Sequence, residues 1–245
     1  MRYFLRILFI SLLFAIHTNV YAEQYKAGDF DYYILSLSWQ SAFCEMNQQK
    51  PECQKQANGD YSATNFALHG LWPNRSGDKK HRYAYCGVEA SVIRLDKKGR
   101  WCDQKPVYAE PELAEKMPGV SSCLQMHEWV KHGSCSGLSM DKYFNVSLDL
   151  MDDIASTRLA TLIRENIGRT ISRKELLAVW EREFPAAKNS LVPRCRKIGN
   201  QSYLTEIRVA LKKNVSDSLS SILLDKPGIR SNCATRIYID EVGFR

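Results

Sequence analysis

Phe66-Ala67-Leu68-His69-Gly70-Leu71-Trp72-Pro73 is one of two stretches that decide the fold and the chemistry expected of this 245-residue chain. The other is His127-Glu128-Trp129-Val130-Lys131-His132-Gly133. Together they hold three of the five histidines of the chain. Histidine is the side chain that gains or loses a proton near neutral pH. The two stretches, one of which adds a lysine and a glutamate, therefore predict a site for acid–base chemistry.

The first stretch has the pattern of a β-strand. We expect the strand to run from Asn65 to Leu71 and to end at Pro73, which lacks a backbone donor. His69 lies near its end, and the adjacent Gly70 permits close approach of backbone or ligand. A histidine in this position is either a packed core residue or part of a site, and this stretch alone leaves both interpretations open.

The second stretch lies on a predicted helix, which Ser121 or Ser122 can cap and which Gly133 ends. Each residue of a helix advances by about 100° around the axis. Trp129 and Val130 then point toward the core. The ionisable residues share the opposite face: His127, Glu128, Lys131 and His132.

The spacing of the two helical histidines argues against a zinc site. A zinc-protease helix carries His-Glu-x-x-His, with its histidines four residues apart on one side. In this chain His127 and His132 point about 140° away from each other. Glu128 and His132 are an i, i+4 pair, so we expect a hydrogen bond that orients the imidazole and raises its pKa. A solvated, charged helix face is the plainer alternative.

RNA is the substrate that suits these side chains. Its 2′-hydroxyl lies beside the phosphorus, so removal of the hydroxyl proton starts an attack that ends in a 2′,3′-cyclic phosphate. His69 and His132 can supply the base and the acid that protonates the leaving 5′-oxygen, in an order that the sequence does not decide. Lys131 and His127 can hold the phosphate oxygens, and Glu128 can orient its neighbours. This chemistry needs no metal and no cofactor.

The remaining patterns predict further strands. A strand is expected over residues 29–40, and another over 236–240. Between Tyr203 and Leu211 every second residue faces one side, whereas Glu206 and Arg208 face the other.

The middle of the chain predicts helices. They are expected over 110–117, over 139–166, and from Ser172, which forms a capping box with Glu175, to about residue 184. Residues 74–103 are polar and basic and predict a long loop region. Strands, then helices, then strands are typical of a single α+β domain, here with a central antiparallel sheet packed with helices.

The N-terminus has the features of a secretory signal peptide. Arg2 and Arg6 flank an apolar run, and Val20-Tyr21-Ala22 offers small residues for cleavage. The run is shorter than the roughly 20 residues of a membrane anchor, which is the alternative. We expect residues 1–22 to be removed. Residues 23–245 should then form a monomeric catalytic domain that is periplasmic or secreted and is not attached to the membrane. Its 32 basic and 27 acidic residues give a net charge of +5, which favours a polyanionic partner.

All eight cysteines follow the signal peptide, and an even number in an exported chain predicts four disulfides. No Cys-x-x-Cys pair occurs, so a zinc ribbon lacks support. Gly133-Ser134-Cys135-Ser136-Gly137 imitates a nucleophile elbow. A thiol hydrolase is therefore a rival hypothesis, and it requires Cys135 to be a free thiol.

Basic clusters occur at Lys79-Lys80-His81-Arg82, at Lys97-Lys98-Gly99-Arg100 and at Arg194-Cys195-Arg196-Lys197. Each can follow a phosphate backbone, and each can instead be a solvated loop.

The two stretches resemble the active-site motifs of the ribonuclease T2 family, and the chain most resembles its bacterial, periplasmic ribonuclease I branch. The resemblance extends to Ile34–Gln40, to Tyr203–Ile207 and to the cysteine placement. It implies an α+β fold and metal-independent endonuclease activity on single-stranded RNA. A non-catalytic RNA or carbohydrate binder on the same scaffold is a further alternative.

By position, the family implies His69 and His132 as the catalytic pair, with His132 as the favoured base. It implies support of the transition state by Glu128 and Lys131, and phosphate binding by His127. Trp72 and Asn74 fall where the family contacts a base. Many relatives have aspartate in place of Asn74, which leaves the base preference open, and Ala67 replaces a common hydroxyl residue.

The same resemblance implies the disulfides Cys86–Cys135 and Cys195–Cys233. Elimination and proximity then leave Cys44–Cys53 and Cys102–Cys123.

Overall fold

The structure, a computed structural model, describes residues 25–77, 83–105, 108, 110–226 and 230–244. The predicted signal peptide and the basic cluster Lys79-Lys80-His81-Arg82 lie outside the described residues. Within those residues, no helix combines the length and the apolar character needed to cross a membrane.

Six strands of the described chain form one sheet in the order β2-β1-β5-β6-β3, with β4 also paired to β5. The strands are β1 (Tyr32–Ser38), β2 (Ala67–Asn74), β3 (Arg169–Ser172), β4 (Leu191–Ile198), β5 (Gln201–Lys212) and β6 (Arg236–Ile239). β1 pairs antiparallel with β2 and β5, β4 pairs antiparallel with β5, and β3 pairs antiparallel with β6. β5 and β6 run parallel and share one residue pair, Tyr203 with Tyr238. The predicted α+β class is confirmed, and the sheet is antiparallel except at this junction.

Helices connect and cover the strands. In the described residues they are α1 (Gln40–Glu45), α2 (Pro51–Gln54), α3 (Tyr61–Thr64), α4 (Ala90–Lys97), α5 (Pro111–Lys116), α6 (Leu124–Lys131), α7 (Met140–Ala155), α8 (Arg158–Glu165), α9 (Arg173–Glu183) and α10 (Leu219–Ile222). Short 3₁₀ turns are η1 (Trp101–Asp103), η2 (Pro118–Ser122), η3 (Gly133–Cys135) and η4 (Pro185–Ser190).

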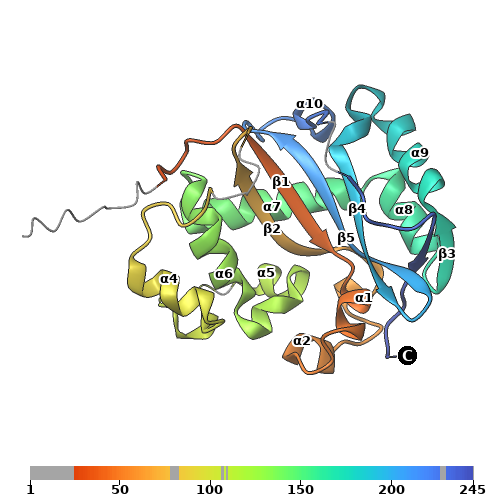
Figure 1. Cartoon of the computed structure of the whole chain (residues 1–245), viewed down its shortest axis with the longest axis horizontal. Helices are drawn as coiled ribbons and strands as arrows, with labels where there is room; N and C mark the ends of the chain where they lie inside the picture. Colours follow the sequence, from red (N-terminus) through yellow and green to blue (C-terminus); the bar gives the residue numbers. More distant parts are fainter. Residues whose placement is uncertain (1–24, 78–82, 106–107, 109, 227–229, 245) are drawn as a thin grey trace, which may run out of the picture.

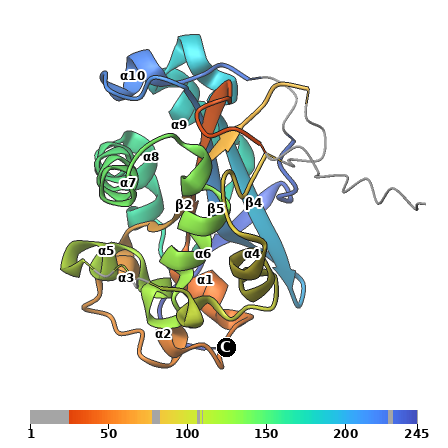
Figure 2. The same cartoon turned by 90° about the vertical axis from the view of Figure 1, so that its left-hand side faces the viewer.

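The two faces of the sheet differ in character. On β5, Ile207, Val209 and Leu211 are fully buried in the main core, and α7 packs against the neighbouring strands β1 and β2. Glu206 and Arg208 alternate with these residues and lie on the opposite face, as predicted. α7 passes behind the strands in Figure 1, and α7 and α8 lie together on one side of the sheet in Figure 2. The other face is therefore where polar side chains can form a site.

Capping residues explain where the helices begin. The helix predicted over residues 139–166 is two helices, because Thr157 accepts a hydrogen bond from the Ala160 amide and starts α8. Ser172 accepts a hydrogen bond from the Glu175 amide at the start of α9, which confirms the capping residue predicted there. Neither serine predicted to cap α6 does so, because that helix starts after Cys123, whose φ is +60°.

The loop predicted over residues 74–103 is partly wrong. α4 lies within it, and its buried residue is Asp96, which is 3% exposed. A helix that buries an aspartate shows a weak apolar pattern, so it was not predicted. Strand β4, whose second half is basic and largely exposed, was not predicted either.

The structure contains the four disulfides in the expected pairing. Cys102–Cys123 and Cys86–Cys135 flank α6 and connect it to the segment that carries α4 and η1. The helix that carries the second motif is thus fixed at both ends.

Candidate active site

A bulge in the sheet places His69. Ser36 of β1 pairs with Gly70 of β2, and the next residue, Leu37, pairs with Leu68, so His69 is an extra residue between these pairs. A bulge redirects the side chain of the extra residue. Here the imidazole turns toward the polar face of the sheet, and its Nδ1 lies 3.5 Å from Ser36 Oγ.

Glu206 of β5 holds the His69 ring. Its Oε2 lies 3.1 Å from His69 Nδ1, and its Oε1 accepts a hydrogen bond from Arg208 Nε. Burial acts to lower the pKa of His69, but the hydrogen bond to Glu206 and the nearby carboxylate charges raise it overall. Burial likewise opposes ionisation of Glu206, yet His69 and Arg208 lower the pKa of that carboxyl to about 2. The pair therefore favours a protonated imidazole.

Glu128 of α6 is buried beneath the site, with 1% of the residue exposed. Its Oε2 accepts a 2.7 Å hydrogen bond from Trp72 Nε1, and its Oε1 lies 3.7 Å from His69 Nε2 and 4.0 Å from His127 Nε2. A Cβ atom on Gly70 would lie 1.9 Å from Glu128 Oε2. Glycine at this position therefore lets the carboxylate lie against the strand between the two imidazoles.

The predicted hydrogen bond between Glu128 and His132 is wrong. Within the described residues His132 Nδ1 is buried without a hydrogen-bond partner. The His132 ring packs against Trp72 instead, with 5.3 Å between the ring centroids. Its pKa is lowered well below the usual value, not raised, because burial and then the nearby positive charges, Lys131 first, disfavour the protonated form.

Trp72 brings the two motifs together. Its indole lies edge-on to the His69 ring, with 5.2 Å between centroids, and it also contacts the His132 ring. The Arg208 guanidinium lies over the indole, 5.0 Å from its centroid. The two imidazoles of the predicted pair thus lie against one side chain.

His127 is held by residues of the segment predicted as a loop. Its Nδ1 lies 2.9 and 3.0 Å from the two carboxylate oxygens of Asp96, and its ring stacks on Trp101 with 4.6 Å between centroids. The buried Asp96 carboxylate also accepts hydrogen bonds from Tyr85 Oη and Gln104 Nε2. Burial opposes its ionisation, but these partners, led by His127, lower the pKa of Asp96. A fully bonded carboxylate therefore fixes the orientation of His127.

The two remaining residues predicted for the site are Lys131 and Asn74. Lys131 is partly exposed at the end of α6, and its charge acts on the adjacent His132. Asn74 is buried at the far end of β2, and its Nδ2 donates a 2.8 Å hydrogen bond to the Trp72 carbonyl oxygen. At about 3.3 Å per strand residue, it lies about 16 Å along β2 from His69. Asn74 is therefore not part of the histidine cluster.

A cleft of about 480 Å³ opens beside His69. Glu206 and Trp101 line it next to the histidine, and Arg196 of β4 lines it as well. Of the two imidazoles of the pair, His69 is the one that faces this cleft.

Sequence reasoning missed the partners that hold the imidazoles: Glu206, Arg208, Asp96 and Trp101. One signal was available for two of them. Glu206 and Arg208 are opposite charges on the same face of a strand whose other face is apolar, and such a pair on a largely buried sheet indicates a specific partner.

The thiol-hydrolase hypothesis is excluded, because Cys135 is bonded to Cys86 and is fully buried. In the part of the chain that the structure describes, no group of three His, Cys, Asp or Glu side chains is arranged to hold a metal ion.

Comparison with known proteins identifies related chains. The profile of the Ribonuclease T2 family matches residues 30–223. Ribonuclease I of Escherichia coli (strain K12) is 30% identical over 97% of both chains. A ribonuclease of Aeromonas hydrophila is 28% identical over 80% of this chain and 78% of its own. The self-incompatibility-associated SF11-RNase of Nicotiana alata shares the fold, with a TM-score of 0.56 and 21% identity over 87% of this chain and 100% of its own.

Proposed function

The chain belongs to the ribonuclease T2 family and is an endoribonuclease, and from this premise we propose how it cleaves RNA. It cuts single-stranded RNA without a metal, by attack of the 2′-hydroxyl on the adjacent phosphorus, and leaves 2′,3′-cyclic phosphate ends. The observation that carries the proposal is that two imidazoles contact the same indole, yet their surroundings shift their pKa values in opposite directions.

His132 is the general base. Its lowered pKa keeps the imidazole neutral near pH 7, and a neutral imidazole can take the 2′-hydroxyl proton. No carboxylate is hydrogen-bonded to its ring within the described residues, so nothing there favours the cation before reaction.

His69 is the general acid. Its raised pKa favours the protonated ring. With Nδ1 engaged by Glu206, the proton given to the leaving 5′-oxygen is the one on Nε2, which lies 3.7 Å from Glu128 Oε1. Two titratable groups whose environments separate their pKa values in this way divide the roles of acid and base. After one turnover His132 carries the proton and His69 has lost it, so the next cycle requires exchange with water.

Lys131 stabilises the transition state, in which the phosphorus is five-coordinate and carries extra negative charge, and His127 binds the phosphate of the substrate. Asp96 contacts His127 through Nδ1, so the Nε2 atom of the same ring is free of that contact. The buried Glu128 lies near both His69 and His127 and orients them. The side chains thus supply acid, base and positive charge themselves.

The substrate bases flank this centre. Trp72 and Asn74 are proposed to contact the base on the 5′ side of the scissile phosphate, where stacking contributes about 1–3 kcal/mol per base. The nucleoside that leaves must lie next to the acid, so we place it in the cleft beside His69.

We also propose that residues 1–22 are a signal peptide and that the mature domain, residues 23–245, acts as a monomer in a periplasm or outside the cell. Four disulfides are consistent with an exported protein, because such bonds persist in oxidising compartments.

The test is a cleavage assay on a single-stranded oligoribonucleotide in excess chelator. We expect cleavage by the wild type, 2′,3′-cyclic ends by mass spectrometry, and no cleavage of the same sequence in DNA. His132→Ala and His69→Ala should each lose most of this activity, whereas Lys142→Gln, an exposed change on α7, should keep it. Loss of wild-type activity in chelator, or cleavage of the DNA, contradicts the proposal.

A further inference from the structure

A second hollow lies beside the junction of β5 and β6. These strands run parallel and share only the residue pair Tyr203–Tyr238, and residues that precede this pair on each strand line the hollow. A hollow of about 870 Å³ lies there. We name it the cationic hollow, and its polar lining includes Arg196, Lys197, Gln201, Asn232 and Arg236.

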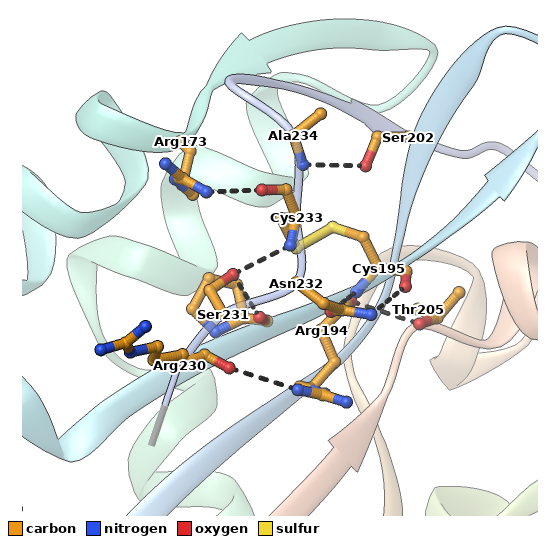
Figure 3. The surroundings of a disulfide bond; sticks show 11 residues. Arg173, Arg194, Cys195, Ser202, Thr205, Arg230, Ser231, Asn232, Cys233 and Ala234 are labelled. Atoms are coloured by element: carbon orange, nitrogen blue, oxygen red, sulfur yellow. Dashed lines mark hydrogen bonds between the residues drawn. A yellow bond between two sulfur atoms is a disulfide. The ribbon is translucent and has the colours of Figure 1, made fainter. Parts of the chain in front are cut away.

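The floor of the cationic hollow is held rigidly by the disulfide Cys195–Cys233 (Figure 3). The Asn232 side chain accepts a 3.0 Å hydrogen bond from the Cys195 amide and donates a 2.9 Å bond to the Cys195 carbonyl oxygen. Arg173 Nη1 donates a 2.5 Å bond to the Cys233 carbonyl oxygen from the side of α9. The hollow is therefore formed before any ligand binds.

Its charge has one sign. Arg196, Lys197 and Arg236 are exposed, and no hydrogen bond or ion pair engages their side chains within the described residues. No aspartate or glutamate is among the described residues that line the hollow. Three unpaired cations among neutral amides and hydroxyls favour an anionic ligand with several charges.

The hollow continues the active-site cleft. Arg196 lines both the cationic hollow and the cleft that contains His69. A polymer that enters the cleft beside His69 can therefore pass Arg196 and reach Lys197 and Arg236 without leaving the surface.

We propose that the cationic hollow binds the phosphate backbone of the RNA strand on the 3′ side of the scissile bond. This direction rests on the proposed function, because it follows from His69 as the acid beside the leaving nucleoside. The basic cluster Arg194-Cys195-Arg196-Lys197, which the sequence left open between a phosphate track and a solvated loop, then has its role in holding the strand that departs.

The test uses oligodeoxynucleotides that contain one ribonucleotide, so that cleavage occurs at a single position. The number of nucleotides is varied on the 3′ side or on the 5′ side, and kcat/KM is measured for the wild type and two double variants. Lys197→Gln with Arg236→Gln removes two charges from the hollow. Lys142→Gln with Arg158→Gln removes two exposed charges from α7 and α8 and is the matched control.

We expect kcat/KM of the wild type and the control to rise with 3′ length, and the hollow variant to lose that rise while it still cleaves the shortest substrate normally. Single-strand binding weakens with salt by a slope of about 0.7 per phosphate contact, so a fourfold rise in salt should weaken wild-type binding about 7-fold more than binding by the hollow variant. An unchanged 3′ dependence in the hollow variant, an equal loss in the control, or a gain from 5′ extension alone overturns the proposal.

If the wild type fails to cleave even the shortest substrate, the proposed function is wrong. A binding experiment then tests the role of the hollow separately. Fluorescence anisotropy with an all-deoxy oligonucleotide, which the enzyme does not cut, then compares the same proteins. Weaker binding by the hollow variant alone supports the backbone site, and equal binding by all three proteins overturns it.

Discussion

Replacement of Glu206 by glutamine should move the alkaline limb of the pH–rate profile to lower pH. Glu206→Gln keeps the size of the side chain and an oxygen that can accept from His69 Nδ1, but it removes the negative charge 3.1 Å from that nitrogen. Burial, which lowers the pKa of His69, remains, and the charge of Arg208, which also lowers it, loses its partner. Both effects favour the neutral imidazole, which cannot act as the acid.

The size of the shift follows from the strength of the lost interaction. A hydrogen bond to a charged group contributes about 1.5–3 kcal/mol, and one pKa unit corresponds to about 1.4 kcal/mol. The alkaline limb should therefore move down by about 1 to 2 pH units. On the alkaline side of the wild-type optimum the variant should be about 10- to 100-fold slower, whereas at acidic pH, where His69 stays protonated, the rates should be similar.

The assay is kcat/KM on a short RNA substrate from pH 4 to 9. Arg208→Gln is a control of opposite sign, because removal of that cation should leave the alkaline limb in place or move it up. The acidic limb, which we assign to His132, should not move in the Glu206→Gln variant. An alkaline limb at the wild-type position in that variant, or an equal loss of rate at every pH, would refute the role of Glu206 in tuning the acid.

Three further outcomes are expected. Gly70→Ala places a Cβ 1.9 Å from Glu128 Oε2 and must displace that carboxylate. We expect kcat to fall about 100-fold, while circular dichroism shows that the fold is retained. A kcat near that of the wild type would contradict the close fit. Asp96→Asn weakens the contact that orients His127. Because phosphate binding acts on substrate and transition state alike, KM should rise about tenfold, with kcat less affected. A change in kcat alone would argue against phosphate binding by His127. Glu206 should contribute about 3 kcal/mol to the fall in the free energy of unfolding between pH 5 and pH 2, because its lowered pKa stabilises the fold above pH 4.5 and this contribution is lost as the pH falls to about 2. Denaturant unfolding at pH 5 and pH 2 should show a smaller fall in Glu206→Gln, and equal falls in both proteins would remove the carboxyl as the cause.

The elements with a strong periodic pattern could be predicted from the sequence. The alternation from Tyr203 to Leu211 identified β5 and put Glu206 and Arg208 on its polar face. The break between α7 and α8 was missed because the apolar pattern continues across Thr157, and the capping hydrogen bond decides the boundary. α4 was missed because its buried position is taken by Asp96, whose partners come from outside the helix.

Sequence patterns could predict the residues of the candidate site that lie within the two motifs. Both histidines of the pair were selected, and the structure brings them to the same indole. The partners of His69 and His127 were not predicted, because Glu206 is 137 residues from His69 and Asp96 is 31 residues from His127. Such contacts depend on strand order and on a disulfide-bonded loop, which local patterns do not encode.

Helical spacing alone predicted the wrong partner for Glu128. The i, i+4 relation put Glu128 near His132, but Trp72 Nε1 engages the carboxylate and Gly70 leaves room for it on the other side. Burial and the nearby positive charges therefore act on His132 without a compensating carboxylate, and its pKa shifts down and not up. The correction supports the proposed roles, since it gives the two imidazoles opposite shifts in pKa.

The central claim is that the two imidazoles differ in proton affinity, and NMR titration of the isotope-labelled histidines tests it most directly. Signals are assigned with His69→Ala and His132→Ala, and the free wild-type enzyme is titrated from pH 4 to 9. We predict that His69 titrates above pH 6.5 and His132 well below it. Titration of His132 at or above the pH of His69 would contradict the assignment of base and acid.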